Sequence, residues 1–376
     1  MKFNIFVFMD LVSYFSDIED FRVVNKCNHL LSDILLIGLF TYLSNGEDYE
    51  DMVLFAENHP DFVREYCKLP NGVPSHDTFN RVFSSLDTSV LNKCLMDCGK
   101  AILDTLDEKQ ICIDGKKIKG VNPRGRGNTR LYIVNAWVSE NELCIGQKKV
   151  ADKSNEITAI PEIINSLDIE NAVVSIDAMG CQKEIASLIM AKKGHYLLSL
   201  KSNQSELFED VVCGFKARSS DCFSEEWEYS SSRFETRKCR ILQAKDVLLD
   251  ENLSVWVGLK TLIQIESERY LGADVQKETR YYISSEEGLS AAYFNELVCG
   301  HWGIENKLHW HLDVTFREDS CRARAGFSAE NLSALRKLAL QIIKNQKDKL
   351  SLNKRRLKAA YNTDYLKDII QNFSCV

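Results

Sequence analysis

The first hundred residues show the apolar spacing of amphipathic helices. Between Leu31 and Leu39 apolar side chains recur every three or four positions, and the same spacing follows Ser75, a candidate helix cap. We therefore expect an N-terminal helical domain over residues 1–105. Such a domain could recognise DNA, and it could equally serve in packing or docking.

From residue 111 onward, short apolar runs typical of strands replace this spacing. The predicted strands are residues 111–114, 131–138, 142–150, 171–177 and 195–201, and the predicted helices are residues 155–167 and 181–193. Strand–helix–strand units form parallel pairs with right-handed crossovers, so this order predicts an α/β fold. In a ribonuclease H-like mixed sheet with this order, the first and fourth strands are neighbours.

Residues 203–290 interrupt this alternation with short strand-like runs, which predict a β-rich insertion. The runs are residues 237–242, 254–259, 262–266 and 280–283. The catalytic core is then expected in two parts, residues 106–202 and 291–346, the second of which includes a long helix over 328–345. Residues 347–376 form a basic tail that we expect to be a small helical appendage.

A polar face distinguishes the segment from His301 to Asp319. Read as a helix, it places residues four apart in one row: His301, Glu305, His309 and Asp313. Beside this row lie Trp302, Asn306 and Trp310. A structural helix would show aliphatic side chains at this spacing, so the face is expected to look into a site built around Glu305.

Two further acids, Asp114 and Asp177, end predicted strands of the sheet. Ligands gather at the carboxyl ends of parallel strands. If the two strands are neighbours, their carboxylates repel, and a cation between them relieves the repulsion. Mg²⁺ prefers such oxygen ligands. With Glu305, three carboxylates could hold two metal ions about 3.5–4 Å apart, for the attacking and leaving oxygens of a phosphodiester.

Each acid alone also has an ordinary explanation. Asp114 could be a turn residue before Gly115, Asp177 a helix cap, and Glu305 a surface acid. The spacing of His301, Glu305 and His309 also admits a zinc site. That alternative lacks the HExxH order and leaves both strand aspartates unused.

Basic and amide side chains flank the acids and are candidate contacts for DNA phosphates. They are Lys116, Lys119, Lys153, Asn155, Gln182, Lys201, Asn203 and Gln204. For His309, Trp302 and Trp310 we keep three alternatives: phosphate contact, base stacking or plain packing.

Net charge and cysteine usage refine this picture. The net charge of -7 argues mildly against nucleic acid, but six basic residues and no acid lie between Lys116 and Arg130. Nine basic residues and one acid lie between Arg336 and Lys358, which could be a binding patch or a solvated face. The 13 cysteines are scattered without CxxC pairs, which favours free thiols in a reducing cytoplasm. We see no secretory signal, and the longest apolar run falls short of the roughly 20 residues of a membrane span.

Several motifs resemble the ISAs-type insertion-sequence transposases, the H-repeat-associated protein family. They are IDGKKIKG (113–120), the run from Val150 to Ala186, YLLSLKSNQ (196–204), RFETR (233–237) and HWGIENKLHWHLDVTFRED (301–319). The resemblance implies a DDE transposase with a ribonuclease H-like core and a β insertion before the last acid. By similarity, Asp114, Asp177 and Glu305 are its metal-binding catalytic acids.

The resemblance also implies cofactors and partners. Two Mg²⁺ or Mn²⁺ ions would serve hydrolysis at the terminal inverted repeats and then strand transfer into target DNA by a 3′ hydroxyl. A homodimer on paired DNA ends and no membrane are expected. Residues of the motifs join the candidate DNA contacts: Arg233, Arg237, His301, Trp302, Asn306, His309, Trp310 and Arg317.

Three positions depart from the family pattern. Cys299 replaces an arginine before the GHW triplet, Lys119 replaces an arginine, and Ser231 begins a changed HGR triplet. A thiol cannot make the bidentate contacts of a guanidinium, so weaker binding of DNA ends is expected. The alternatives to a transposase are a DNA-binding relic or domesticated protein that no longer cuts, and a nuclease without strand transfer. Retention of all three acids favours the transposase over the relic, whereas the sequence does not separate the transposase from the nuclease.

Overall fold

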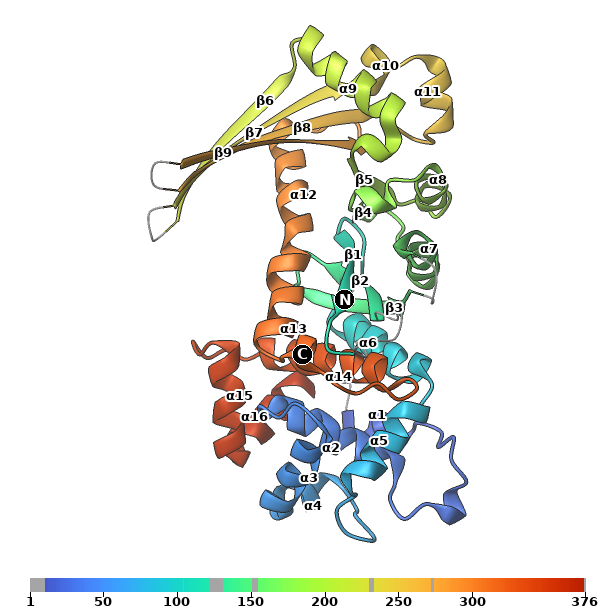
Figure 1. The fold of residues 1–376 in the computed structure, drawn as a ribbon, viewed down its shortest axis with the longest axis vertical. Coiled ribbons are helices and arrows are strands. Elements are labelled where there is room, and N and C mark those ends of the chain that lie inside the picture. Colours follow the sequence, from blue (N-terminus) through green and yellow to red (C-terminus); the bar gives the residue numbers. More distant parts are fainter. Residues whose placement is uncertain are drawn as a thin grey trace, which may run out of the picture.

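The computed structural model describes residues 11–103, 105–121, 131–150, 155–229, 233–271 and 274–374. The molecule is elongated, with helices from both ends of the chain at one end of the long axis and residues 205–284 at the other (Figure 1). The strands of residues 110–200 lie between them. The predicted site therefore lies in the middle of the molecule.

The N-terminal part is helical, as predicted. Its helices are α1 (Leu11–Ser16), the 3₁₀ turn η1 (Val24–Lys26), α2 (Leu31–Leu43), α3 (Tyr49–Asn58), α4 (Pro60–Tyr66), α5 (His76–Ser85) and α6 (Thr88–Ile102). The predicted cap Ser75 is confirmed, because its side chain accepts from the backbone N–H of Thr78. Helix α5 buries Phe79, Val82 and Phe83, so its apolar face packs inside the protein.

Five strands and two helices follow in the predicted order. They are β1 (Gln110–Ile118), β2 (Leu131–Val138), β3 (Leu143–Lys149), α7 (Glu156–Ser166), β4 (Val173–Ile176), η2 (Ala178–Gly180), α8 (Lys183–Ala191) and β5 (His195–Leu200). Strand β1 pairs in parallel with β4, and β4 with β5, whereas β1, β2 and β3 pair antiparallel. The predicted neighbourhood of the first and fourth strands is confirmed. The predicted end of the first strand at Asp114 is wrong, because β1 continues through Gly115 to Ile118.

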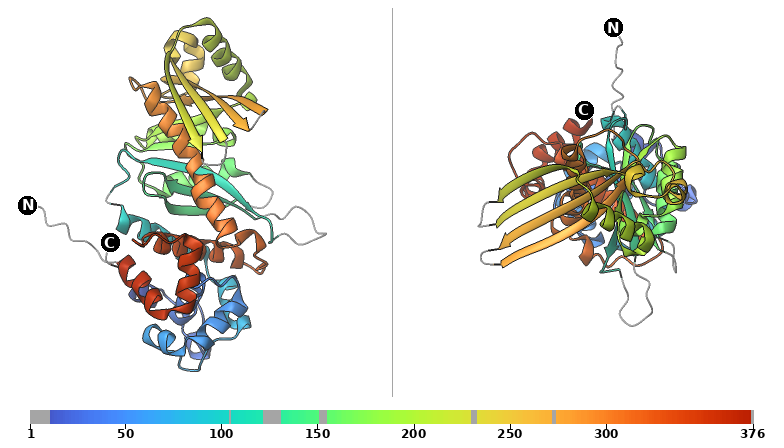
Figure 2. Two further views of the ribbon diagram at one scale, coloured as in Figure 1. Left: turned by 90° about the vertical axis from the view of Figure 1, so that its left-hand side faces the viewer. Right: turned by 90° about the horizontal axis from the view of Figure 1, so that it is seen from above.

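The predicted insertion is rich in strands and extends the same sheet. Its elements are η3 (Ser202–Gln204), α9 (Ser205–Ala217), β6 (Asp221–Tyr229), β7 (Arg233–Gln243), α10 (Ala244–Val247), α11 (Asp250–Val255), β8 (Thr261–Leu271) and β9 (Asp274–Ser284). Because β9 pairs antiparallel with β5, the described strands form one nine-stranded sheet, β3-β2-β1-β4-β5-β9-β8-β7-β6. The far ends of β6–β9 project sideways from the body (Figure 2).

One predicted strand of this region, residues 254–259, is wrong. Helix α11 ends at Val255, and a turn follows in which Gly258 has a positive φ of 79°. The error has a physical reason: Val255, Trp256, Val257 and Leu259 form a short apolar run, and such a run does not by itself distinguish a strand from the end of a helix.

The C-terminal part begins with α12 (Ala291–Gly303), which runs along the sheet from the projecting strands to the helical end (Figures 1 and 2). It continues as a π-helix, η4 (Ile304–His309), then α13 (Trp310–Val314), η5 (Glu318–Ser320), α14 (Ser328–Lys344), α15 (Leu352–Tyr361) and α16 (Thr363–Ser374). Helices α7 and α8 lie on the opposite face of the sheet from α12 (Figure 1). Within the described residues, no helix is both long and apolar enough to cross a membrane.

The predicted basic tail is helical, but it is part of the core. Ala359, Leu366 and Ile369 are buried in the same cluster as α2 and α14. The guanidinium of Arg356 is buried and donates to the carbonyls of Tyr42 (2.8 Å) and Gly46 (3.0 Å). Four cations of the basic stretch are buried, namely Arg336, Lys337, Arg355 and Arg356. The stretch is therefore not a continuous basic surface.

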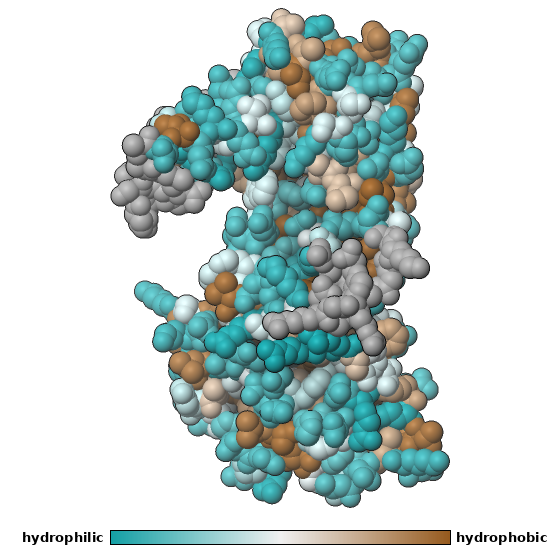
Figure 3. Space-filling view, in the orientation of Figure 1, coloured by the Kyte–Doolittle hydropathy of each residue, from teal (hydrophilic) through white to brown (hydrophobic). Residues whose placement is uncertain are grey.

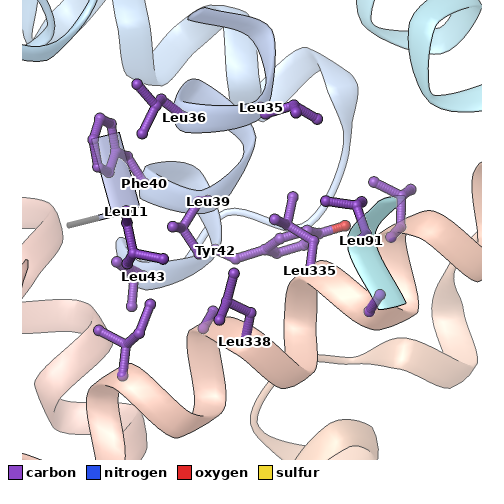
Figure 4. Close-up of a cluster of buried hydrophobic side chains, with 14 of the residues drawn as sticks. Leu11, Leu35, Leu36, Leu39, Phe40, Tyr42, Leu43, Leu91, Leu335 and Leu338 are labelled. Atoms are coloured by element: carbon purple, nitrogen blue, oxygen red, sulfur yellow. The ribbon is translucent and has the colours of Figure 1, made fainter. Parts of the chain in front are cut away.

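Helices α2 and α14 form the centre of the largest apolar cluster. Leu39 and Leu43 of α2 face Leu335 and Leu338 of α14, with Leu11 and Leu91 nearby (Figure 4). Ile304 and Leu308 of the π-helix belong to the same cluster. The N-terminal helices thus share a core with the segment that contains Glu305.

We predict that Leu338→Ala lowers the free energy of unfolding by about 2–5 kcal/mol, because it leaves a cavity between α2 and α14. Urea denaturation followed by circular dichroism measures the change. Leu249→Ala is the matched control, since Leu249 is 73% exposed. Equal stability of the two variants would contradict the shared core.

Candidate active site

The pairing of β1 with β4 places two aspartates side by side. Ile113 and Ile176 are partners in the parallel register, and Asp114 and Asp177 follow them. Asp177 is held by its own turn, because Oδ1 accepts from the backbone N–H of Met179 (3.1 Å) and Gly180 (3.3 Å). Asp177 therefore caps a turn, as the ordinary explanation supposed, and it also lies at the predicted acidic position.

A third carboxylate at this place, Glu156, was not predicted. It is the first residue of α7, whose N-terminus is capped by Asn155 accepting from the backbone N–H of Ile157 (3.1 Å). The Glu156 carboxylate lies against Gly115. A Cβ atom added to Gly115 would stand 3.0 Å from Glu156 Oε2 and would overlap Glu156 Oε1. An acid in the first turn of a helix usually reflects the helix dipole, so its position in the sequence is an ambiguous signal.

The carboxylates repel one another. Burial raises the pKa of Asp114 to about 7, and repulsion by Asp177, Glu156 and Glu305 adds to this effect. Burial and the charge of Asp177 raise the pKa of Glu156 to about 6. Burial also raises the pKa of Asp177, against hydrogen bonds from the backbone and the charge of Lys201. The charges of the other three acids therefore all act on Asp114.

Glycines and buried hydrogen bonds hold α12 on the sheet and so place Glu305. A Cβ at Gly303 would stand 2.7 Å from the Trp137 ring, so only glycine permits this approach. Gln110 Nε2 donates to the carbonyl of Leu297 on α12 (2.7 Å) and to Ser175 Oγ on β4 (3.0 Å). Glu305 itself is exposed in the π-helix.

The predicted polar row is interrupted by this π-helix, a feature often found at functional sites. His301 Nδ1 lies 3.0 Å from Ser175 Oγ. His309 Nε2 lies 3.1 Å from Asn135 Nδ2, and its Nδ1 lies 3.5 Å from Asp114 Oδ2. Burial lowers the pKa of His301 to about 4 and the pKa of His309 to about 3, so both imidazoles are neutral at pH 7. His301 and His309 of the predicted row therefore face the sheet, whereas Glu305 is exposed.

The zinc alternative is not supported, because the two imidazoles contact different strands. No three His, Cys, Asp or Glu side chains in the described parts of the chain are arranged to hold a metal ion. The acids around Asp114 are therefore neighbours, but they do not already form a complete set of metal ligands. The donors nevertheless fit a hard divalent cation in kind, since several partly buried carboxylates repel one another and oxygen is the ligand that Mg²⁺ prefers.

Some candidate DNA contacts gather beside Asp177. Asn203 Nδ2 donates to the carbonyl of Ala178 (2.8 Å), and Gln204 Nε2 donates to that of Cys181 (2.9 Å). Gln182 donates to the carbonyl of Met179 (3.2 Å), and Lys201 is exposed nearby. The expected polar edge at the ends of β4 and β5 therefore exists.

Other candidates lie elsewhere. Lys116 is 6% exposed and pairs with Asp313 (2.6 Å) and Glu318 (3.1 Å), so we assign it a structural role in place of the expected DNA contact.

The remaining basic candidates are dispersed. Lys119 pairs with Asp319 (2.7 Å). Arg317 pairs with Glu47 of the N-terminal part (3.0 Å). Lys153 and the side chain of Arg233 lie outside the described residues.

A groove of about 760 Å³ lies between α12 and strands β7–β9, and Glu305, Arg237, Trp302 and Asn306 line it. The sequence did not point to three further lining residues: Glu235, Arg269 and Arg280. Figure 3 shows the hollow beneath the projecting strands, with mostly hydrophilic residues around it. Trp310 lies outside this lining, 51% exposed.

Buried Glu235 orders the arginines of this groove. Its carboxylate binds Arg237 Nη2 (3.0 Å) and Arg269 Nε (3.1 Å). Arg237 Nη1 also donates to Cys299 Sγ (2.6 Å). The guanidinium of Arg280 lies over the Trp302 ring, 4.2 Å from its centroid. Arg280 also pairs with Glu278 (2.7 Å), so the groove has three arginines, each held by an acid, even without an arginine at position 299.

Fold and site together define a mixed α/β protein with an acidic centre where two parallel strands meet. Two family models match the chain: "Transposase DDE domain" over residues 105–342 and "DDE_Tnp_1-associated" over residues 12–98. In Escherichia coli K12, "Putative protein YbfL" and "H repeat-associated putative transposase YhhI" are each 37% identical over 96% of this chain and 97% of the relative. "Putative transposase YncI" of Escherichia coli O157:H7 is 37% identical over 97% of this chain and 95% of its own. The chain belongs to the DDE transposase family.

The raised pKa of Asp114 predicts a pH-dependent stability. An acid whose pKa is raised on folding destabilises the folded state once it ionises. This loss of folding stability is absent below pH 3.8, increases between pH 3.8 and about pH 7, and has its full size above that range. Asp114→Asn should therefore raise the free energy of unfolding of the metal-free protein at pH 8 by on the order of 1–3 kcal/mol, with little change at pH 4.

Urea denaturation at both pH values, with EDTA present, measures this difference. Asp168→Asn is the control, since Asp168 is exposed and outside the acidic centre. A stability gain of the same size at both pH values would disprove the ionisation penalty.

Proposed function

We propose that this DDE transposase cleaves DNA at insertion-sequence ends and transfers the strands, with Asp114, Asp177 and Glu305 as its catalytic acids. The observation that supports this most is the register of β1 and β4, which sets Asp114 beside Asp177. The electrostatic effect of Glu305 on Asp114 supports the third member. The proposed cofactor is two Mg²⁺ or Mn²⁺ ions, which when bound would activate the attacking oxygen and stabilise the leaving oxygen of the phosphodiester.

The chain's own residues bind and orient in this proposal. The three acids would hold the cations, and neutral His309, whose Nδ1 lies 3.5 Å from Asp114 Oδ2, would orient Asp114. Three side-chain amides order the loop beside Asp177 by donating hydrogen bonds to backbone carbonyls: Gln182, Asn203 and Gln204. Lys201 offers an exposed ammonium to a DNA phosphate at the same edge.

We infer a ribonuclease H-like core from the strand order, because three antiparallel strands precede two parallel ones. The proposed domains are an N-terminal helical domain (1–105), a core in two parts (106–202 and 291–346), a β-rich insertion (203–290) and a C-terminal tail (347–376). The shared apolar cluster means that the N-terminal domain and the tail pack on the core.

The groove beneath β7–β9 is the proposed path of the DNA backbone to Glu305. The groove is lined by Arg237, Arg269 and Arg280, and guanidinium groups make bidentate contacts with phosphate.

By resemblance to other transposases, we further propose that two copies act on paired DNA ends. Because DNA is the proposed substrate, we also propose that the protein acts in the bacterial cytoplasm.

A second candidate is a DNA-binding relic that no longer cuts. The specific observation in its favour is Cys299, where the family pattern has an arginine. Against it stands the retained group of acids, which a protein that only binds DNA does not need. A nuclease without strand transfer would share every feature of this site.

We predict that Arg280→Ala weakens DNA binding and lowers the slope of log affinity against log salt concentration by about 1, because one phosphate contact is lost. Fluorescence anisotropy over a salt series measures this with the inverted-repeat DNA. Arg64→Ala is the control, since Arg64 lies on α4 and its side chain is 72% exposed. Equal slopes for the two variants would exclude the groove from DNA binding.

Cleavage tests the central proposal. Purified protein with the terminal inverted repeats should nick DNA only when Mg²⁺ or Mn²⁺ is present, and Asp177→Asn should abolish nicking while retaining the fold. Gel analysis of labelled ends measures both nicking and strand transfer. Equal products from wild type and Asp177→Asn would remove Asp177 from the mechanism, and salt-sensitive binding without any cleavage would establish the relic.

A further inference from the structure

We propose that Glu156 is a fourth metal-binding acid of the catalytic centre, acting with Asp114 and Asp177. The proposal rests on the proposed metal-dependent function and adds a ligand that the three-acid pattern lacks.

The first argument is the direction from which each acid arrives. Alternate residues of β1 face α12 and its continuation: Cys112 donates to the carbonyl of Gly300, and Lys116 binds Asp313. Asp114 lies between them on this face, as its approach to His309 shows. Gly115 therefore faces the other side of the sheet, where α7 lies and where the Glu156 carboxylate rests on it.

Strand β4 stops at the level of this contact. Its last residue, Ile176, pairs with Ile113, and the chain then turns at Asp177. Beyond that point β1 has no β4 partner on this side, so no strand separates Glu156 from the two aspartates. Helix α7 thus brings the Glu156 carboxylate to this gap from the face of the sheet opposite α12 (Figure 1).

The second argument is the environment of Glu156. Within the described parts of the chain, no hydrogen bond or ion pair engages its half-buried carboxylate. By contrast, Glu162 on the same helix pairs with Lys148 Nζ at 2.6 Å. A partly buried charge needs a partner, and the neighbours of Glu156 include Asp177, which has the same sign.

A structural role in helix initiation accounts for Glu156 less well. Asn155 already caps the backbone N–H of Ile157, and an acid serving only the helix dipole needs no contact with β1. The contact instead requires glycine at position 115. With Glu156 the proposed centre has four acids, and the formal charge of these four carboxylates equals in size that of two divalent cations.

The test measures Mn²⁺ binding to the full chain by titration calorimetry at pH 7.5, without DNA. Wild type should bind Mn²⁺, and Asp177→Asn should lose most of this binding. Glu156→Gln should weaken the affinity roughly tenfold or more, of the order seen when groups of a metal site are removed. Glu162→Gln, the matched control on α7, should bind as wild type does.

Gly115→Ala provides a second variant if Glu156→Gln does not fold. It retains the acid but displaces it from β1, and it should weaken Mn²⁺ binding in the same direction. Wild-type affinity in both Glu156→Gln and Gly115→Ala, with binding lost in Asp177→Asn, would overturn the role of Glu156 alone. Absence of Mn²⁺ binding in folded wild type would overturn the proposed metal site as a whole.

Discussion

Repulsion between like charges at the end of β4 is the interaction on which the account of this site depends. The parallel register fixes Asp114 and Asp177 as neighbours, and the surrounding protein partly removes them from water. Such an arrangement destabilises the folded chain unless a proton or a cation is present. A divalent cation would restore the balance, so the proposed function links folding and cofactor binding at one place.

The rest of the molecule fixes the helical segment that contains Glu305, the proposed third acid. Helix α12 lies close to the sheet because Gly303 lets it approach Trp137, and Gln110 ties it to β1 and β4. Beyond Glu305 the chain enters the core formed by α2 and α14, which fixes the far end of the segment. The N-terminal helices thus stabilise the position of Glu305 although they contribute no acid to the centre.

Sequence reasoning succeeded where the physics is periodic or topological. The order of strands and helices was sufficient to predict that Asp114 and Asp177 meet. It failed where a residue's partner is distant in the chain: Lys116 looked like a DNA contact, and its burial depends on acids nearly two hundred positions away. Arg356 is similar, because backbone carbonyls of the N-terminal part surround it. Glu156 was missed because an acid at the start of a helix is common for other reasons, and the π-helix was missed because its change of hydrogen-bond register leaves no periodic mark in the sequence.

Anomalous X-ray diffraction from crystals grown with Mn²⁺ would test the central claim most directly. The account predicts anomalous density between the carboxylates of Asp114 and Asp177, within ligand distance of both. A folded protein whose two aspartates stay free of metal at saturating Mn²⁺, or whose only Mn²⁺ lies elsewhere, would contradict it.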